Sequence, residues 1–131
     1  MRSLLSIALL LGSAVATASP CGSIKRDLSN SDKAEWSPAI ARQLDVSNVT
    51  ILQTFSLKDW IIVYIETPNS DPPFLFFHGA PDKTHYVTLW SGGAQHDEEA
   101  SIRAWAIKNA SGIPQDLAAC FAWHVTKARD L

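Results

Sequence analysis

The sequence contains only two cysteines, Cys21 and Cys120, among its 131 residues. It therefore has no C-x-x-C pair, and it also lacks the H-E-x-x-H pattern, so two familiar metal-binding spacings are missing. We expect no metal and no cofactor. In an oxidising compartment the two cysteines would form a single disulfide, and closing a loop of about 100 residues stabilises a fold by up to about 4.7 kcal/mol. This bridge would staple an N-terminal arm to the last helix.

A long apolar run is also missing, because a membrane-spanning helix needs about 20 apolar residues and the longest mostly apolar run, Leu4–Leu11, is much shorter. Arg2 precedes this run, and the small residues Ala16–Ala18 follow it. This order is typical of a secretory signal peptide, here residues 1–18, with cleavage after Ala18. We therefore expect a soluble protein that is secreted to the extracellular space.

Positive charge is scarce and scattered. The chain carries 11 Lys and Arg against 13 Asp and Glu, a net charge of −2 at pH 7, and loss of Arg2 with the signal makes the charge more negative. The lysines occur singly, so the basic stripe of a nucleic-acid or membrane-surface binder is missing. We exclude nucleic acid and membrane as partners and expect a protein or a small hydrophobic ligand.

Three short patterns bear on export. Asn48 and Asn109 begin N-x-S/T sequons, which predict a glycoprotein if the source is a eukaryote. Lys25–Arg26 is a dibasic pair of the kind that secretory proteases cut, and cleavage there would separate Cys21 from the domain unless a disulfide held the peptide. We expect the pair to stay uncut, because single Lys-Arg pairs are common in solvated arms.

After an arm over residues 19–35, the rest of the chain predicts one domain over residues 36–131. About 110 residues remain once the signal is removed, enough to bury a core without help. Ser37 as an N-cap, with Pro38 at the first helical position, predicts a short first helix, and Asp32 is an alternative start.

Four segments of strand length follow, rich in β-branched and aromatic residues; they are residues 48–56, 60–67, 74–79 and 85–90. In the first, alternation from Val49 to Phe55 places all odd-numbered residues on one face. From Asp97 the apolar residues recur at helical spacing, and a second such stripe follows Pro114. The expected fold is α+β: a short N-terminal helix, a four-stranded antiparallel meander, and two C-terminal helices packed on one face.

A helix followed by a four-stranded meander is similar to the general plan of cystatin-like folds, which host inhibitors as well as small isomerases and dehydratases. The resemblance is architectural only, because the inhibitor hallmark Q-x-V-x-G is not met by Gln53–Leu57. No activity follows from the plan alone.

The middle strands are apolar on both faces. In Trp60–Ile65 and in Phe74–Phe77, the residues that point to either face are all large and apolar. In a strand with one solvated face, apolar residues should instead alternate with polar ones. Three short helices would cover only one face well, so we expect the other to be closed by sheet curvature, the arm, a second copy in a homodimer, or a ligand. This predicts an apolar, aromatic recognition surface or pocket, with candidate binding residues Tyr64, Phe76, Tyr86 and Trp90.

A double glycine, Gly92–Gly93, follows the last strand and precedes the acids Asp97, Glu98 and Glu99. Neither the P-loop pattern nor the dinucleotide-binding pattern is present. Carboxylates in a first helical turn each gain about 0.3–1 kcal/mol from the helix dipole and would repel a phosphate. We interpret the three acids as capping groups of the following helix.

Two alternatives involve catalysis. His85, His96 and Glu99 are candidate acid and base groups of a small enzyme built around this corner. Cys120 and His124 are four residues apart on one predicted helix, and they would form a reactive thiolate and imidazole pair only if no disulfide forms.

These patterns favour a small secreted, disulfide-stapled binding protein of effector, inhibitor or carrier type, with the Trp90–Glu99 corner at the rim of its site. The alternative is a small secreted enzyme, an isomerase, dehydratase or hydrolase, that acts on a hydrophobic small molecule. Binding is preferred to catalysis because no catalytic motif is complete.

Overall fold

The computed structural model describes residue 12 and residues 19–129, so the predicted signal segment and its cleavage site lie outside the described residues, apart from Gly12. The elements in chain order are α1 (Asn30–Leu44), β1 (Thr50–Leu57), β2 (Trp60–Glu66), β3 (Phe74–His78), β4 (Thr88–Trp90), η1 (His96–Glu98), α2 (Glu99–Asn109) and α3 (Gln115–Lys127). The strands form one antiparallel sheet in the order β1-β2-β3-β4. The predicted α+β meander is confirmed.

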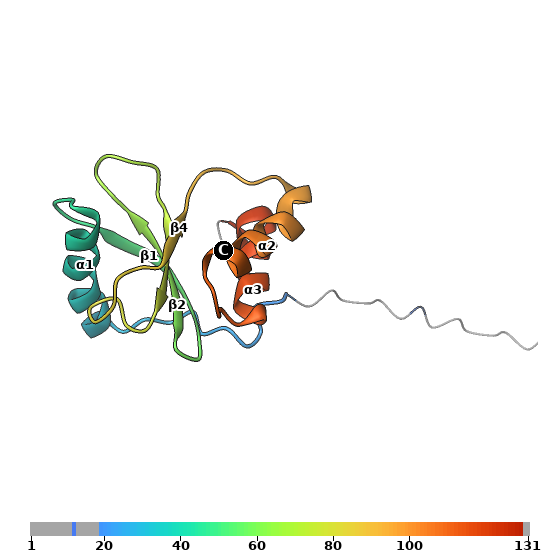
Figure 1. Cartoon of the computed structure of the whole chain (residues 1–131), viewed down its shortest axis with the longest axis horizontal. Coiled ribbons are helices and arrows are strands. Elements are labelled where there is room, and N and C mark those ends of the chain that lie inside the picture. The colour runs from blue at the N-terminus through green and yellow to red at the C-terminus, as the bar shows by residue number, and fades with distance from the viewer. Residues whose placement is uncertain (1–11, 13–18, 130–131) are drawn as a thin grey trace, which may run out of the picture.

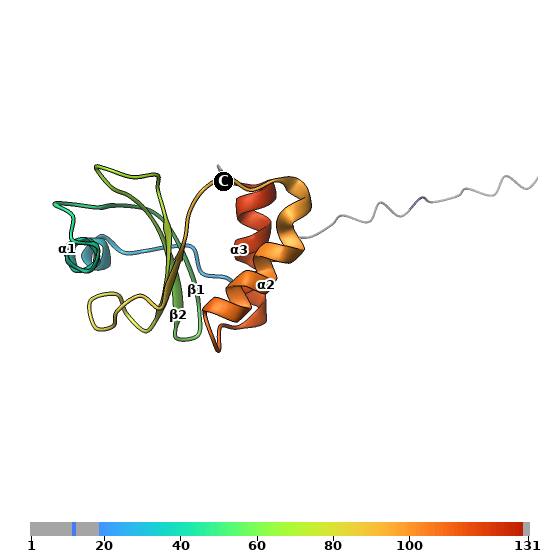
Figure 2. The same ribbon diagram turned by 45° about the horizontal axis from the view of Figure 1, so that its top comes forward.

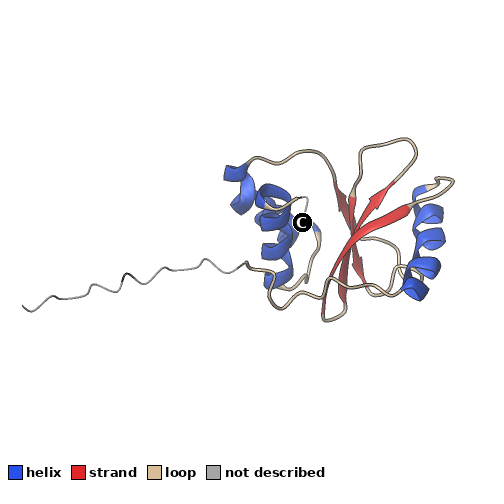
Figure 3. Cartoon of the chain, turned by 180° about the vertical axis from the view of Figure 1, so that it is seen from behind, coloured by secondary structure: helices blue, strands red, loops and turns tan. Residues whose placement is uncertain are grey.

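The elements form three layers. Figure 1 shows the sheet in the middle, with α1 on one side and α2 and α3 on the other, and the turned views in Figures 2 and 3 show the same arrangement. The two C-terminal helices therefore pack on one face, as predicted. The opposite face belongs to α1.

Helix α1 begins earlier than Ser37. Ser29 is its N-cap, and the Ser29 hydroxyl accepts a hydrogen bond of 3.0 Å from the backbone N–H of Asp32. Pro38, which was expected in the first turn, lies inside the helix at an exposed position. Burial of the neighbouring Trp36 and Ile40 against the sheet offsets the free-energy cost of a proline in the helix interior. The prediction of Ser37 as the N-cap was therefore wrong, because the helix already begins after Ser29.

A β-bulge divides β1 into two halves. The pairing with β2 shifts by one residue between Ile51 and Gln53, because Ile51 lies opposite Ile65 whereas Gln53 lies opposite Tyr64. The extra residue reverses the side-chain alternation. As a result Ile51 packs on the α1 side and Phe55 on the α2 and α3 side, and the prediction of a single face for all odd-numbered residues was wrong.

Each face of the sheet has its own hydrophobic core. Ile62, Phe74 and Phe76 pack with residues of α2 and α3, whereas Val63 and Phe77 pack with residues of α1. All five of these side chains are fully buried. The prediction that both faces need cover agrees with this burial, but the prediction that the chain's own helices cover only one face was wrong.

The length of α1 explains that error. Its 15 residues give a helix of about 22 Å at 1.5 Å per residue. The seven residues of β2 span about 23 Å at 3.3 Å per residue, so the helix is about as long as the longest span of the middle strands. A helix that started at Ser37 would have covered little more than half of that length.

The N-terminal arm is part of the fold. Cys21 and Cys120 form the predicted disulfide, and Ile24 is buried in the core beside α3. The backbone N–H of Lys25 donates to the carbonyl of Ser56 at 2.9 Å, and the N–H of Ser56 donates to the carbonyl of Lys25 at 2.8 Å. The arm thus pairs with the outer edge of β1 as it passes from α3 to α1, along the lower part of Figure 1.

Candidate functional site

An open groove lies where the connection after β4, the loop before β3 and the last turn of α3 meet. It has a volume of about 520 Å³, within the range of small-molecule sites. We call it the corner groove. It is lined by Asp71, Pro72, Gly92, Gly93, Ala94, His96, Val125, Thr126 and Arg129.

The connection from β4 to α2 forms one wall of the corner groove. Gly92 has a φ of 102°, in the left-handed region that glycine adopts without strain, and it lets the chain turn away from the sheet directly after Trp90. The turn ends at η1, where the backbone N–H of Gln95 donates to the Glu98 carboxylate at 3.3 Å. Glu98 is therefore a capping group, as predicted for the acids.

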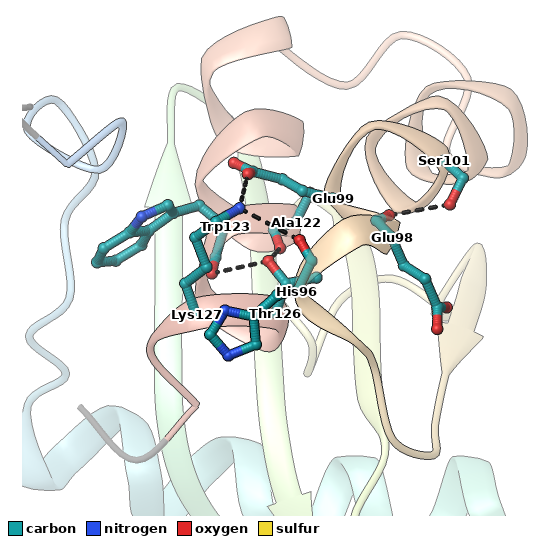
Figure 4. Close-up of polar contacts among 8 residues, drawn as sticks. All are labelled: His96, Glu98, Glu99, Ser101, Ala122, Trp123, Thr126 and Lys127. Carbon is teal, nitrogen blue, oxygen red and sulfur yellow. Dashed lines mark hydrogen bonds and ion pairs between the residues drawn. The ribbon is translucent and has the colours of Figure 1, made fainter.

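Glu99 has a different role from the predicted cap. It forms an ion pair with Lys127 in the last turn of α3, and the Lys127 ammonium also lies 3.5 Å from the carbonyl oxygen of His96 (Figure 4). Beside them the Thr126 hydroxyl donates to the carbonyl of Ala122 at 2.7 Å. The two contacts of Lys127 join the start of α2 to the end of α3 and position the backbone of His96 at the groove.

Arg129 connects the corner groove to a cluster of aromatic rings. Its guanidinium carbon lies 5.4 Å from the ring centroid of Trp90 and 5.7 Å from that of Phe74, within the range of cation–π attraction. One guanidinium nitrogen donates to the carbonyl of Gly92 at 2.6 Å. Phe121 meets Trp90 edge-on, with ring centroids 5.7 Å apart. Arg129 thus places a cation at the groove, beside the aromatic rings of the core.

The four predicted binding residues do not form one surface. Tyr64 stacks on Phe74 with ring centroids 4.1 Å apart, Phe76 is fully buried, and Trp90 is half-buried, all on the face that α2 and α3 cover. Tyr86 lies on the other face, next to Phe77. None of the four is among the lining residues of the corner groove, because the helices cover the sheet that carries them.

The three predicted catalytic residues are likewise not assembled. His96 lines the groove, and Glu99 is engaged with Lys127. His85 lies in the loop between β3 and β4, which is held against α1 because the Gln43 side-chain amide donates to the carbonyls of Pro81 and Thr84, both at 2.9 Å. The imidazole of His85 contacts its neighbour Tyr86 instead of the groove.

The two charged residues of the groove were not among the predicted site residues. Asp71 lies in a proline-rich loop, and Arg129 follows the last helical stripe. Neither residue had a sequence pattern that distinguished it from other surface charges. They come together because the sheet and α3 bring their segments to the same corner.

The thiol alternative is excluded. Cys120 is in the disulfide, so it carries no nucleophilic thiol. His124 is fully buried, with its ring centroid 4.8 Å from that of Phe55 and 6.2 Å from that of Phe74. Four-residue spacing predicted proximity between Cys120 and His124 but not the burial of the imidazole among aromatic rings.

His78 has a carboxylate partner, Asp59, and neither residue lines the corner groove. His78 contacts Asp59 at 2.7 Å, and its ring stacks on Trp60 with centroids 4.6 Å apart. The hydrogen bond from His78, followed by one from the backbone of Asp59, lowers the pKa of the Asp59 carboxyl. Over the described residues, no three His, Cys, Asp or Glu side chains gather closely enough to hold a metal ion.

The two sequon asparagines are both exposed. Asn48 lies in the connection after α1, and Asn109 ends α2, where its side-chain amide donates to the carbonyl of Trp105 at 2.8 Å. Exposure is what a glycan acceptor needs, and glycosylation stays a prediction.

Comparison of the chain with protein-family models, with curated proteins and with solved structures finds no match in any of the three. Among the helices of the described part of the chain, none combines the length and the apolar character that crossing a membrane requires. The function therefore has to be inferred from the corner groove.

Proposed function

We propose that this chain is a secreted binding protein of effector, inhibitor or carrier type that holds a small, mainly apolar ligand in the corner groove. The observation that carries the proposal is the groove itself, which opens at the Trp90–Glu99 corner with a volume of about 520 Å³. Ligand sites are typically concave and apolar, with a few polar groups that orient the ligand.

The lining of the groove has this character. Pro72, Ala94 and Val125 supply apolar surface, whereas Arg129 and Asp71 supply one charge of each sign. Arg129 is anchored by its bond to the Gly92 carbonyl and by the rings beneath it, so little side-chain freedom would be lost on binding. An apolar ligand with one polar or anionic group would suit this surface.

Secretion is supported indirectly. A disulfide such as Cys21–Cys120 persists in oxidising compartments, in keeping with the signal sequence expected over residues 1–18. Expression in a secreting host should yield a protein whose intact mass corresponds to a chain that begins at Ser19. Retention of the first 18 residues in the exported protein would contradict this part of the proposal.

The binding proposal is tested by filling the groove. A Cβ at Gly93 would meet no atom within 4 Å, and Gly93 lacks the positive φ of Gly92, so the backbone and the space at the Cβ allow Gly93→Leu, which adds bulk at the groove. Gly22 has equally open surroundings in the arm, and Gly22→Leu is the matched control.

The probes are 1-anilinonaphthalene-8-sulfonate and its neutral analogue N-phenyl-1-naphthylamine, titrated by fluorescence. We expect saturable one-to-one binding to the unmodified protein and to Gly22→Leu, and binding at least about tenfold weaker, or about 1.4 kcal/mol, in Gly93→Leu. Equal binding by both variants, or no saturable binding of either probe to the unmodified protein, would contradict the proposal.

One observation favours the enzyme as a second candidate, because His96 shares the groove with the carboxylate of Asp71. A hydrolase built on His96 should release 4-nitrophenol from 4-nitrophenyl butyrate faster than His96→Gln does. His85→Gln is the control, since His85 lies outside the groove. Equal rates for the unmodified protein and His96→Gln would eliminate this hydrolase.

A further inference from the structure

The dibasic pair Lys25–Arg26 was expected in a solvated arm, but it lies at the edge of the sheet, where Lys25 pairs with Ser56 of β1. Both backbone hydrogen-bonding groups of Lys25 are bonded to Ser56 of β1, at 2.9 and 2.8 Å. A protease that cuts after a basic pair binds its substrate as an extended strand through these same backbone groups. In the folded chain they are already occupied.

The Arg26 side chain is held as well. Its guanidinium carbon lies 3.9 Å from the ring centroid of Phe55, and its Nε donates to the carbonyl of Thr54 at 3.0 Å. In return the Thr54 hydroxyl donates at 3.1 Å to the Arg26 carbonyl, the carbonyl of the bond that would be cut. Burial lowers the pKa of the guanidinium, which agrees with a side chain withdrawn from water.

The residues on both sides of the pair anchor it further. On one side Ile24 is buried in the core and Cys21 is covalently bonded to Cys120 of α3. On the other side Leu28 packs against the core on the α1 face, and Ser29 caps α1. For a segment around Lys25–Arg26 to enter a protease cleft, several of these contacts must therefore break at the same time.

We propose that Lys25–Arg26 is a latent proteolytic processing site that is masked while the Cys21–Cys120 disulfide is intact and becomes cleavable when a small thiol reduces it. In the first step two thiol molecules are oxidised to their disulfide, and Cys21 and Cys120 each regain a thiol. In the second step water hydrolyses the Arg26–Asp27 amide, leaving a carboxylate on Arg26 and an amine on Asp27.

The order of the two steps decides the product. With the disulfide intact, a cut after Arg26 would leave the arm peptide attached to α3 through Cys120. After reduction, the same cut releases the peptide and uncovers the edge of β1 and the ring face of Phe55. This site is independent of the corner groove.

Limited digestion with trypsin, followed by mass spectrometry, tests the proposal. The protein is compared as the oxidised chain, as the chain in a small thiol, and as a Cys21→Ser/Cys120→Ser variant. Cleavage at Lys25–Arg26 should be at least about tenfold slower in the oxidised chain, because cleavage of a masked site follows the population of its opened state. Cleavage after Arg42, inside α1, reports general unfolding.

A second variant keeps the test valid if the cysteine variant fails to fold. Thr54→Val removes the hydrogen bond to the Arg26 carbonyl and should speed cleavage of the oxidised protein several-fold, whereas Thr50→Val, at the exposed start of β1, should not. Equal cleavage at Lys25–Arg26 in the oxidised and reduced chains would overturn the proposal. So would cleavage there that always accompanies cleavage after Arg42, because the site would then open only by global unfolding.

Discussion

The two faces of the sheet are both closed within one chain, but by different means. On one face the single helix α1 lays Trp36 and Ile40 against Val63 and Phe77. On the other face α2, α3, the disulfide and a cluster of aromatic rings form the core. One helix is enough to bury the middle of a sheet face fully, although Leu89 of β4, which lies opposite Leu75 on the α1 side, stays 39% exposed. At the end of the face that α2 and α3 cover, the connections around Gly92 leave the corner groove.

The largest expected effects come from truncating one phenylalanine on each face. Phe76→Ala on the α2 and α3 side and Phe77→Ala on the α1 side should each lower the free energy of unfolding by about 3–5 kcal/mol, because both rings are fully buried. Urea unfolding at several protein concentrations measures this. A Phe77→Ala loss below about 1 kcal/mol, or one that depends on protein concentration, would mean that a second copy helps to close the α1 face.

Removal of the disulfide directly affects only the core on the α2 and α3 side of the sheet, where Cys21 and Cys120 pack. The Cys21→Ser/Cys120→Ser variant should lose roughly 2–4 kcal/mol of stability, since the bridge closes a long loop of the unfolded chain. Thermal unfolding of this variant and of the reduced wild-type protein should give the same melting temperature. Different melting temperatures would show that the serine substitutions themselves disturb the core around Cys120.

The start of α1 gives a smaller and more local test. Ser29→Ala removes the hydroxyl that accepts from the Asp32 N–H, and it should cost about 1 kcal/mol. Ser37→Ala, at the N-cap position that the sequence suggested, lies inside the helix and should change stability by less than about 0.5 kcal/mol. Chemical denaturation of both variants decides between the two starts, and the reverse ranking would place the cap at Ser37.

The smallest expected effect concerns the exposed pair of His78 and Asp59. Because the pKa of Asp59 is lowered in the folded state, its contribution to stability is present above the pKa of the unfolded carboxyl and is lost as the pH falls through the lowered value. The stability difference between the wild type and Asp59→Asn should therefore shrink as the pH falls below about 4. Carboxyl NMR titration should show the Asp59 pKa rising in His78→Gln and unchanged in His85→Gln.

Local features of the sequence predicted most of the elements. The strand segments, the meander order and the two C-terminal helices follow from apolar periodicity and from the breakers between the segments, which act over a few residues. The face assignment of Phe55 failed because nothing local marks the bulge next to Ile51. The start of α1 failed because Ser37 followed by Pro38 is a typical start of a helix, whereas tertiary burial of Trp36 extends the helix back to its N-cap at Ser29.

The sequence pointed to the Trp90–Glu99 corner, where the corner groove lies, but not to most of the residues that line the groove. The turn after Trp90 was visible as a double glycine, and His96 was a candidate on that basis. Asp71 and Arg129 could not be predicted, because they come from segments that meet the turn only after the sheet and α3 have packed. The predicted binding residues are divided between the two faces for the same reason: the helices cover Phe76, and Tyr86 and Trp90 pack on opposite faces of the sheet.

The sequence by itself determined that the middle strands must be buried on both sides and that Cys21 and Cys120 can pair only with each other within the chain. Both follow from residue type and number, which need no knowledge of distant contacts. Only the tertiary structure decided that α1 covers the second face, that the arm seals the edge of β1, and that a groove forms at the end of α3. These outcomes depend on contacts between residues far apart in the chain, and such contacts leave no periodic signal in the sequence.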